Sequence, residues 1–129
     1  MQPSEQIKAT EEYQKDIDRV GLSEEGHNAL IGIMDDDHFK DKMSCYRFSI
    51  AIALRERLDI RSHNVIRPSG HMYLISQIDP DGYFGVAIEE LNPSLKHIKY
   101  RALEKYADLG IKLLSQKLLE NGKIIYWDL

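Results

Sequence analysis

The chain has 129 residues, of which 43% are hydrophobic and 29% are charged, and its formal net charge at pH 7 is −4. These values are typical of one globular domain and argue against wholesale disorder. The negative charge argues against binding of nucleic acid through the overall field of the protein, because that mode needs a basic surface. A local basic cluster can still contact phosphates.

No stretch approaches the ~20 consecutive apolar residues that a membrane-spanning helix needs. The N-terminal residues lack the basic start and the apolar core of a signal peptide. The one cysteine, Cys45, lies inside an apolar run and cannot form an internal disulfide, which agrees with a reducing compartment. We therefore expect a cytoplasmic protein with no membrane partner.

The N-terminal part, residues 1–21, is mostly polar, and we predict an arm there, followed by a single helical domain over residues 22–129. Tyr13, Ile17 and Val20 share a helical face at i, i+4, i+7, so the arm can form a short helix that ends at Gly21. Its ordering can depend on a partner chain.

The next predicted helix has Ser23 as its N-cap, with Glu24 and Glu25 in the positive first turn. Apolar residues follow as far as Met34. The acidic run over 35–38, Asp-Asp-Asp-His, then interrupts the pattern and predicts a linker to the most apolar part of the chain.

The helix predicted over 42–57 has the clearest signal, because Asp41 can cap it and apolar residues occur on nearly all of its sides. Such a helix is either the centre of its domain or lies partly in a subunit interface, and both interpretations stay open. We predict a homo-oligomer that uses this helix. The predicted interface residues are Met43, Tyr46, Phe48, Ile50 and Ile52.

Beyond a loop, the sequence predicts a short strand over 72–78 and a turn over 79–82. Segment 83–91 can form a second strand or a helix. We prefer the helix, because Asp81 can cap it and its apolar residues keep the spacing i, i+3, i+4, i+7.

A long amphipathic helix is predicted over 95–120, with Asn121-Gly122 as its stop and Asp108 placed four residues before Lys112 as an ion pair. Gly110 is unexplained in a helix unless another backbone approaches it closely. The final segment, KIIYWDL, is apolar enough to pack, and it can pair with the strand over 72–78. The predicted fold is mainly α, with α+β as the alternative: a compact helical domain with one or two short strands.

Metal ligation is weighed for Asp35, Asp37 and His38. Contiguous residues rarely converge on one ion, and no HxH, HxxE or CxxC spacing accompanies them. The sequence DPDG over 79–82 lacks the glutamate that closes a calcium loop and indicates a tight turn. We predict no metal site and no cofactor, and a small metal-dependent enzyme is the least favoured alternative.

Catalytic residues are not predicted either. Cys45 is the only thiol, and its apolar surroundings indicate a buried, unreactive side chain. The sequence has no glycine-rich phosphate loop, dinucleotide fingerprint or nucleophile elbow. The aromatic residues of the second half fit core and interface packing better than a base-stacking platform.

Two basic clusters are candidate contacts for nucleic acid or another partner. The first can bind phosphate, or can be a solvated helix end that complements the helix dipole. The second lies at the start of the long helix, where positive charge opposes the dipole, and this favours a binding role. The candidates are Arg55, Arg57, Arg61, His63 and Arg67 in the first cluster and Lys99, Arg101 and Lys105 in the second.

The order of the predicted elements resembles small helical accessory proteins of bacterial DNA phosphorothioation (Dnd-type) systems and related defence operons. The segments that carry the resemblance are FKDKMSCYRFSIAIAL, SQIDPDGYFGVAIEEL and YADLGIKLLSQKL, none of which is a catalytic signature. The resemblance implies a non-enzymatic oligomer that associates with DNA or with a DNA-processing complex. Such association is expected to use a lysine-rich surface, whereas this chain is acidic overall. The alternative is a structural or immunity-type protein whose acidic surface binds a basic partner.

Overall fold

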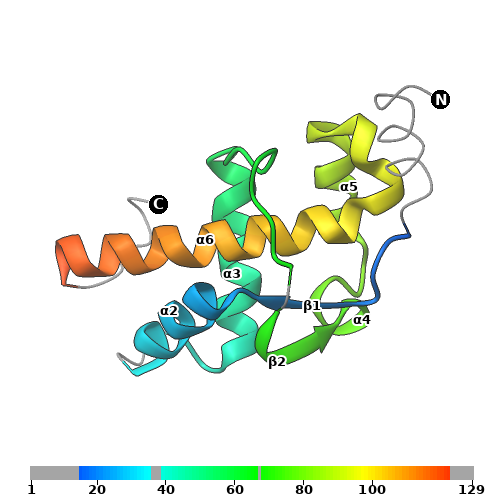
Figure 1. Cartoon of the computed structure of the whole chain (residues 1–129). Coiled ribbons are helices and arrows are strands. Elements are labelled where there is room, and N and C mark those ends of the chain that lie inside the picture. The colour runs from blue at the N-terminus through cyan, green and yellow to red at the C-terminus, as the bar shows by residue number, and fades with distance from the viewer. Residues whose placement is uncertain (1–14, 36–38, 67, 123–129) are drawn as a thin grey trace.

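The computed structural model describes residues 15–35, 39–66 and 68–122. Its fold is mainly α with one two-stranded antiparallel sheet, as predicted. Figure 1 shows α6 running across the whole molecule, with α2 and α3 packed along it. The elements are β1 (Arg19–Leu22), α2 (Glu24–Asp35), α3 (Lys42–Arg55), β2 (Ser69–Leu74), α4 (Ile75–Ile78), α5 (Tyr83–Leu91), the 3-10 helix η1 (Pro93–Ile98) and α6 (Lys99–Asn121).

The core is centred on the crossing of α3 and α6. Gly110 of α6 lies against the backbone carbonyl of Ser49 in α3, and a Cβ at position 110 would overlap that oxygen. A glycine inside a helix costs about 1 kcal/mol relative to alanine. Here the close approach of the α3 backbone requires a glycine at position 110. Such an approach is the explanation expected from the sequence for a glycine inside this helix.

The buried side of α3 contains three of the residues predicted for a subunit interface. Tyr46 and Ile50 are fully buried and Ile52 is 3% exposed, all by packing within this chain. The structure therefore places these three side chains in the core instead of on an interface. Met43 and Phe48, the other two candidates, are only partly buried.

The N-terminal described residues depart from the predicted helix. Arg19–Leu22 forms β1, which pairs antiparallel with β2 so that Val20 lies opposite Tyr73. Asp16 accepts hydrogen bonds from the backbone N–H groups of Tyr100 (3.0 Å) and Arg101 (2.9 Å) at the start of α6. The prediction of a helix ending at Gly21 is wrong, because the partner strand lies far away in sequence and local periodicity does not reveal it.

The helix starts follow local capping chemistry, with one correction. Asp41 accepts the N–H of Ser44 (2.8 Å) at the start of α3, as predicted. Segment 83–91 is helical, also as predicted, but its first N–H groups are bound by Asp79, which accepts from Phe84 (2.9 Å) and Gly85 (2.9 Å). Asp79, and not Asp81, therefore supplies the carboxylate at this end of α5.

The remaining boundaries differ modestly from the prediction. β2 ends at Leu74, since Ile75–Ile78 forms the single helical turn α4. The predicted long helix is divided into η1 and α6, and α6 ends at Asn121 with Gly122 in a left-handed conformation (φ 71°), as its sequence predicted. The segment KIIYWDL lies outside the described residues.

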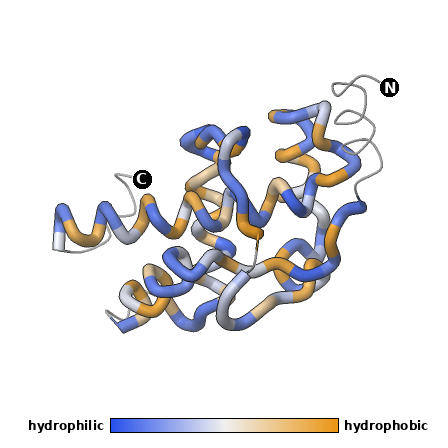
Figure 2. Tube along the Cα trace, in the orientation of Figure 1, coloured by the Kyte–Doolittle hydropathy of each residue, from blue (hydrophilic) through white to orange (hydrophobic). Residues whose placement is uncertain are grey.

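The distribution of hydropathy agrees with this packing. Figure 2 shows apolar positions recurring along α6 at helical intervals, between hydrophilic ones. None of the described helices is long and apolar enough to cross a membrane.

Candidate functional site on α6

Helix α6 carries two buried acidic residues one turn apart. Asp108 is fully buried, and Glu104 is 6% exposed. Burying a carboxylate costs free energy unless it is paired and hydrogen-bonded, so such groups are candidates for a functional or fold-specifying role. Neither was singled out as a site residue from the sequence.

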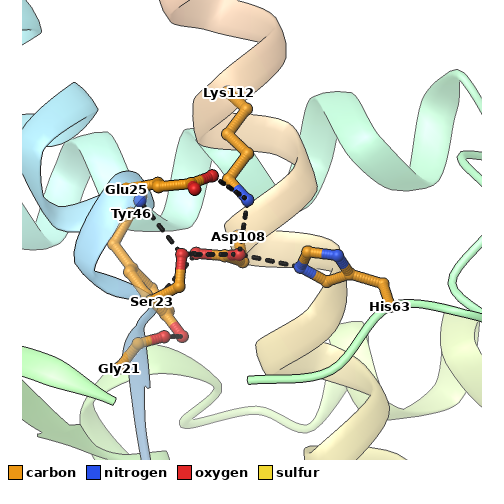
Figure 3. Close-up of polar contacts among 8 residues, drawn as sticks. Gly21, Ser23, Glu25, Tyr46, His63, Asp108 and Lys112 are labelled. Carbon is orange, nitrogen blue, oxygen red and sulfur yellow. Dashed lines mark hydrogen bonds and ion pairs between the residues drawn. The ribbon is translucent and has the colours of Figure 1, made fainter. Parts of the chain in front are cut away.

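The carboxylate of Asp108 is bound on all sides (Figure 3). It accepts hydrogen bonds from the backbone N–H (2.9 Å) and the hydroxyl (2.8 Å) of Ser23, and Oδ2 lies 2.7 Å from Nε2 of His63 and 3.3 Å from Nζ of Lys112. Burial by itself raises the pKa of Asp108, but the bonds from Ser23 and His63 and the charge of Lys112 together hold that pKa below its ordinary value. Asp108 is therefore ionised at neutral pH.

The same contact explains a glycine in α2. A Cβ at Gly26 would overlap the carboxylate of Asp108, so even alanine would not fit at this position without a shift of Asp108. Ser23 also accepts the N–H of Gly26 through its hydroxyl (3.1 Å), which confirms its predicted role as the N-cap of α2. The start of α2 and the middle of α6 are thus fitted to each other.

Ser23, Asp108 and His63 do not have the connectivity of a hydrolytic triad. In a triad the histidine lies between the serine and the carboxylate, so that it can accept the serine proton. Here the serine hydroxyl and the imidazole both bind the carboxylate directly. The arrangement joins three segments of the chain and offers no activated nucleophile.

Glu104 is held differently. Its Oε2 accepts the N–H of Gly21 (2.9 Å), while the hydroxyl of Tyr46 donates to the carbonyl of Gly21 (2.9 Å). Burial raises the pKa of Glu104 to about 7, and the Gly21 N–H and the charge of Arg101 oppose that shift only in part. Oε1 has no hydrogen-bond partner among the residues that the structure describes.

Two hollows lie over the first turns of α6, between the 57–66 loop and segment 91–98. The Glu104 hollow, of about 340 Å³, is lined by loop residues 64–66, by Leu95 and Ile98, and by Arg101, Glu104 and Lys105. The Arg57 hollow, of about 360 Å³, includes Arg57, Arg61 and Tyr106. In Figure 1 the green loop and the yellow region around η1 flank α6 at this place.

Two residues of each predicted basic cluster line these hollows, whereas Lys99 of the second cluster lines neither. Arg57 and Arg61 line one hollow, and Arg101 and Lys105 line the other. We call the two hollows together the basic groove. Because both hollows are bounded by the same three segments, cations from distant parts of the sequence can contact one extended partner.

Some of the predicted basic residues also face acidic neighbours. The two pairs formed by Arg55 and Arg61 are exposed, and such pairs contribute about 0–1 kcal/mol, so a phosphate can replace their carboxylates at small cost; the pair of Lys99 is partly buried. The pairs are Arg55 with Glu56 (3.4 Å), Arg61 with Asp59 (2.7 Å) and Lys99 with Glu89 (2.8 Å).

The other members of the first cluster stand apart from the basic groove or outside the described chain. Arg55 is exposed at the end of α3, and it does not line either hollow. The imidazole of His63 is hydrogen-bonded to the carboxylate of Asp108. Arg67 lies outside the described residues.

The sequence raised two further kinds of site, a metal site at the acidic run 35–38 and a reactive thiol at Cys45. Asp37 and His38 lie outside the described residues, and within the described ranges no three His, Cys, Asp or Glu side chains are grouped to hold a metal ion. Cys45 is fully buried, and burial raises the pKa of its thiol to about 12. The prediction that this cysteine is buried is confirmed.

Comparison of the chain with family models, curated proteins and solved structures yields no match in any of the three. The interpretation of the site therefore rests on its geometry and chemistry.

Proposed function

We propose that this protein is a non-catalytic accessory protein that associates with DNA through the basic groove. The observation that carries the proposal is that cations from two basic clusters, separated in sequence, line two hollows bounded by the 57–66 loop, segment 91–98 and α6. Arginine and lysine contacts to phosphates supply the sequence-independent part of DNA binding. Membership of a bacterial DNA-modification or antiphage-defence complex is the wider proposal that the sequence resemblance adds.

The acidic net charge is compatible with this proposal. The Debye length is about 8 Å at physiological ionic strength, so acids on distant faces have little effect on a phosphate in the basic groove. Within the described ranges, Arg57 and Lys105 have no ion-pair partner. These two cations are available without the loss of an existing contact.

The backbone at Arg57 gives independent support. Arg57 has a φ of 51°, and its N–H donates to the carbonyl of Leu54 (3.1 Å) while Leu58 N–H donates to Ala53 (3.0 Å). This is the bonding pattern of a helix C-terminus that usually has glycine at the left-handed position. The sequence places a cation there at a cost of about 1 kcal/mol relative to glycine, which is consistent with a role for the side chain.

Fluorescence anisotropy with duplex and single-stranded DNA at two salt concentrations tests the proposal. We expect binding that weakens steeply with salt, since each phosphate contact contributes about −0.9 to the slope of log K against log salt on duplex DNA. The triple variant Arg57→Gln, Arg61→Gln, Lys105→Gln should lose at least about tenfold in affinity and reduce that slope.

The matched control removes the same number of positive charges away from the basic groove, with Lys40→Gln, Lys42→Gln and Lys117→Gln. It should bind nearly as the unmodified protein does. Equal losses in both triple variants would show that only the overall charge matters. An absence of binding at low salt would remove DNA as the partner and favour the protein-binding alternative.

The homo-oligomer remains part of the proposal, with Met43 and Phe48 as the interface candidates that are only partly buried. Light scattering of the unmodified protein and of the Met43→Ser, Phe48→Ser variant measures it. A monomer mass for the unmodified protein at all concentrations would exclude the oligomer.

A further inference from the structure

The Glu104 hollow has an oriented carboxylate at its base. Glu104 is 6% exposed, and the bond from Gly21 N–H to Oε2 fixes the direction of its carboxyl group. Oε1 is left without a partner among the described residues, although the side chain lines the hollow. Among the described residues this oxygen does not belong to the fully buried polar atoms that lack a partner, so it is open to the hollow and can accept a hydrogen bond from an N–H or O–H donor of a ligand.

The walls of this hollow are apolar and come from two separate segments. Val65 and Ile66 of the 57–66 loop contribute one side, and Leu95 and Ile98 of η1 contribute to the other. Ile66 is 83% exposed in the described chain, so its apolar surface is available to a ligand in the hollow. A flat, weakly polar group that enters between these residues would cover apolar surface on both of its faces.

Two cations flank the carboxylate on α6. Arg101 lies three residues before Glu104, and Lys105 lies directly after it, and both line the hollow. An inorganic anion would be attracted by the two cations but repelled by the carboxylate of Glu104. A simple amine would be attracted by the carboxylate but repelled by the cations. The lining therefore fits a ligand that carries a negative group, a flat apolar body and an N–H edge.

We infer that the Glu104 hollow is a nucleotide site that takes up one base of a bound strand, with guanine preferred. Oε1 of Glu104 accepts from the N1–H and N2–H edge of guanine, while Oε2 keeps its bond from Gly21 N–H. The aliphatic side chains cover the faces of the base, and Arg101 and Lys105 contact the phosphate. Uracil and thymine present a single N–H between two carbonyl oxygens, which a carboxylate repels. The volume of about 340 Å³ is within the range of small-molecule sites. This inference rests on the proposed association with DNA and names the group that the groove recognises.

Isothermal titration calorimetry of the full chain with GMP, UMP and inorganic phosphate tests the site without DNA. We expect GMP to bind at least about tenfold more tightly than UMP or phosphate, which is the order of discrimination that well-placed hydrogen bonds to a base edge provide. Glu104→Gln should reduce the ratio of GMP to UMP affinity to less than about threefold, because the amide oxygen is held by Gly21 N–H and the amide NH2 group then faces the N–H edge of guanine. GMP that binds no more tightly than phosphate would overturn the inference.

A second variant separates base recognition from phosphate binding. Lys105→Gln should weaken GMP and UMP by similar factors and leave their ratio unchanged, and Lys117→Gln, which lies far along α6, should change neither. Thermal melting verifies that each variant is folded. A Glu104→Gln variant that is folded and keeps the full preference for GMP would also overturn the inference.

Anisotropy with a guanine-rich strand and an oligothymidine strand distinguishes failure of the inference from failure of the proposed function. Tighter binding of the guanine-rich strand that is lost in Glu104→Gln supports both. Equal, salt-sensitive binding of both strands would overturn the base site and leave DNA association standing. No binding of either strand would remove DNA association itself.

Discussion

Nε2 of His63 lies 2.7 Å from Oδ2 of the fully buried Asp108. This contact ties the 57–66 loop to α6, and the same loop forms a wall of both hollows of the basic groove. A buried charge in the core of the domain thus positions a surface on which the proposed binding depends.

Replacing His63 by alanine should loosen the 57–66 loop without unfolding the domain. In this variant Ser23 still donates hydrogen bonds to Asp108 and Lys112 still supplies its counter-charge, so we expect a loss of about 1–3 kcal/mol in the free energy of unfolding, as for a hydrogen bond to a charged group. Hydrogen exchange should speed up at residues 64–66 and stay unchanged in α2. Ser62→Ala, at an exposed position of the same loop, is the control. Equal protection of the loop in both variants would mean that the histidine does not hold it.

Asp108→Asn should be more damaging, because it leaves the donors of Ser23, His63 and Lys112 around a neutral side chain. Breaking a buried charge pair costs about 3–5 kcal/mol, and we expect a loss at the lower end of this range in urea denaturation at pH 7. The pKa of Asp108 is lowered in the folded state, so its contribution is present above the unfolded pKa near 4 and is lost as pH falls through the folded pKa. The variant should therefore lose less stability than the unmodified protein below pH 4. Parallel acid profiles would contradict this assignment.

Glu104 should give the opposite pH dependence. Its folded pKa of about 7 lies above the ordinary value of 4.5 for a glutamate, so between these values the folded protein holds a proton that the unfolded chain has released. Stability contributed by this group is complete below about pH 4.5 and is lost as pH rises through 7, by roughly 3 kcal/mol in total. Glu104→Gln should remove this decline, as measured by urea denaturation at pH 5 and pH 8. If both proteins lose the same stability between these pH values, the carboxyl group titrates normally.

The parts of the fold that the sequence predicted are those with local causes. Ser23 and Asp41 cap helices through N–H groups three residues away, and Gly122 ends α6 through its own conformation. β1 was missed because the residue opposite Val20 is Tyr73, on a strand that follows two helices and a long loop. Periodicity within a short segment contains no information about such a partner.

The candidate site was missed for the same physical reason. Asp108 and Lys112 have the spacing of an exposed ion pair, and that pair exists at 3.3 Å, but nothing nearby in sequence shows that Asp108 is buried. Its other donors come from Ser23, 85 positions away, and from His63, 45 positions away. The usable signal was the placement of two acids, Glu104 and Asp108, next to the apolar positions of an amphipathic helix.

Arg57→Gly should move stability and DNA affinity in opposite directions. The left-handed conformation at this position, with φ 51°, disfavours any side chain, so glycine should raise the free energy of unfolding by up to about 1 kcal/mol. Removal of the cation should at the same time weaken DNA binding in anisotropy and lower the salt slope by about one phosphate contact. Arg55→Gln removes a nearby exposed charge outside the basic groove and should alter neither quantity appreciably. If Arg57 served only to end α3, the glycine variant would be more stable and would bind DNA as the unmodified protein does. Higher stability together with weaker binding therefore indicates a role of the side chain in binding. Raised stability with unchanged anisotropy would therefore take Arg57 out of the proposed DNA contacts and leave its conformation without a binding explanation.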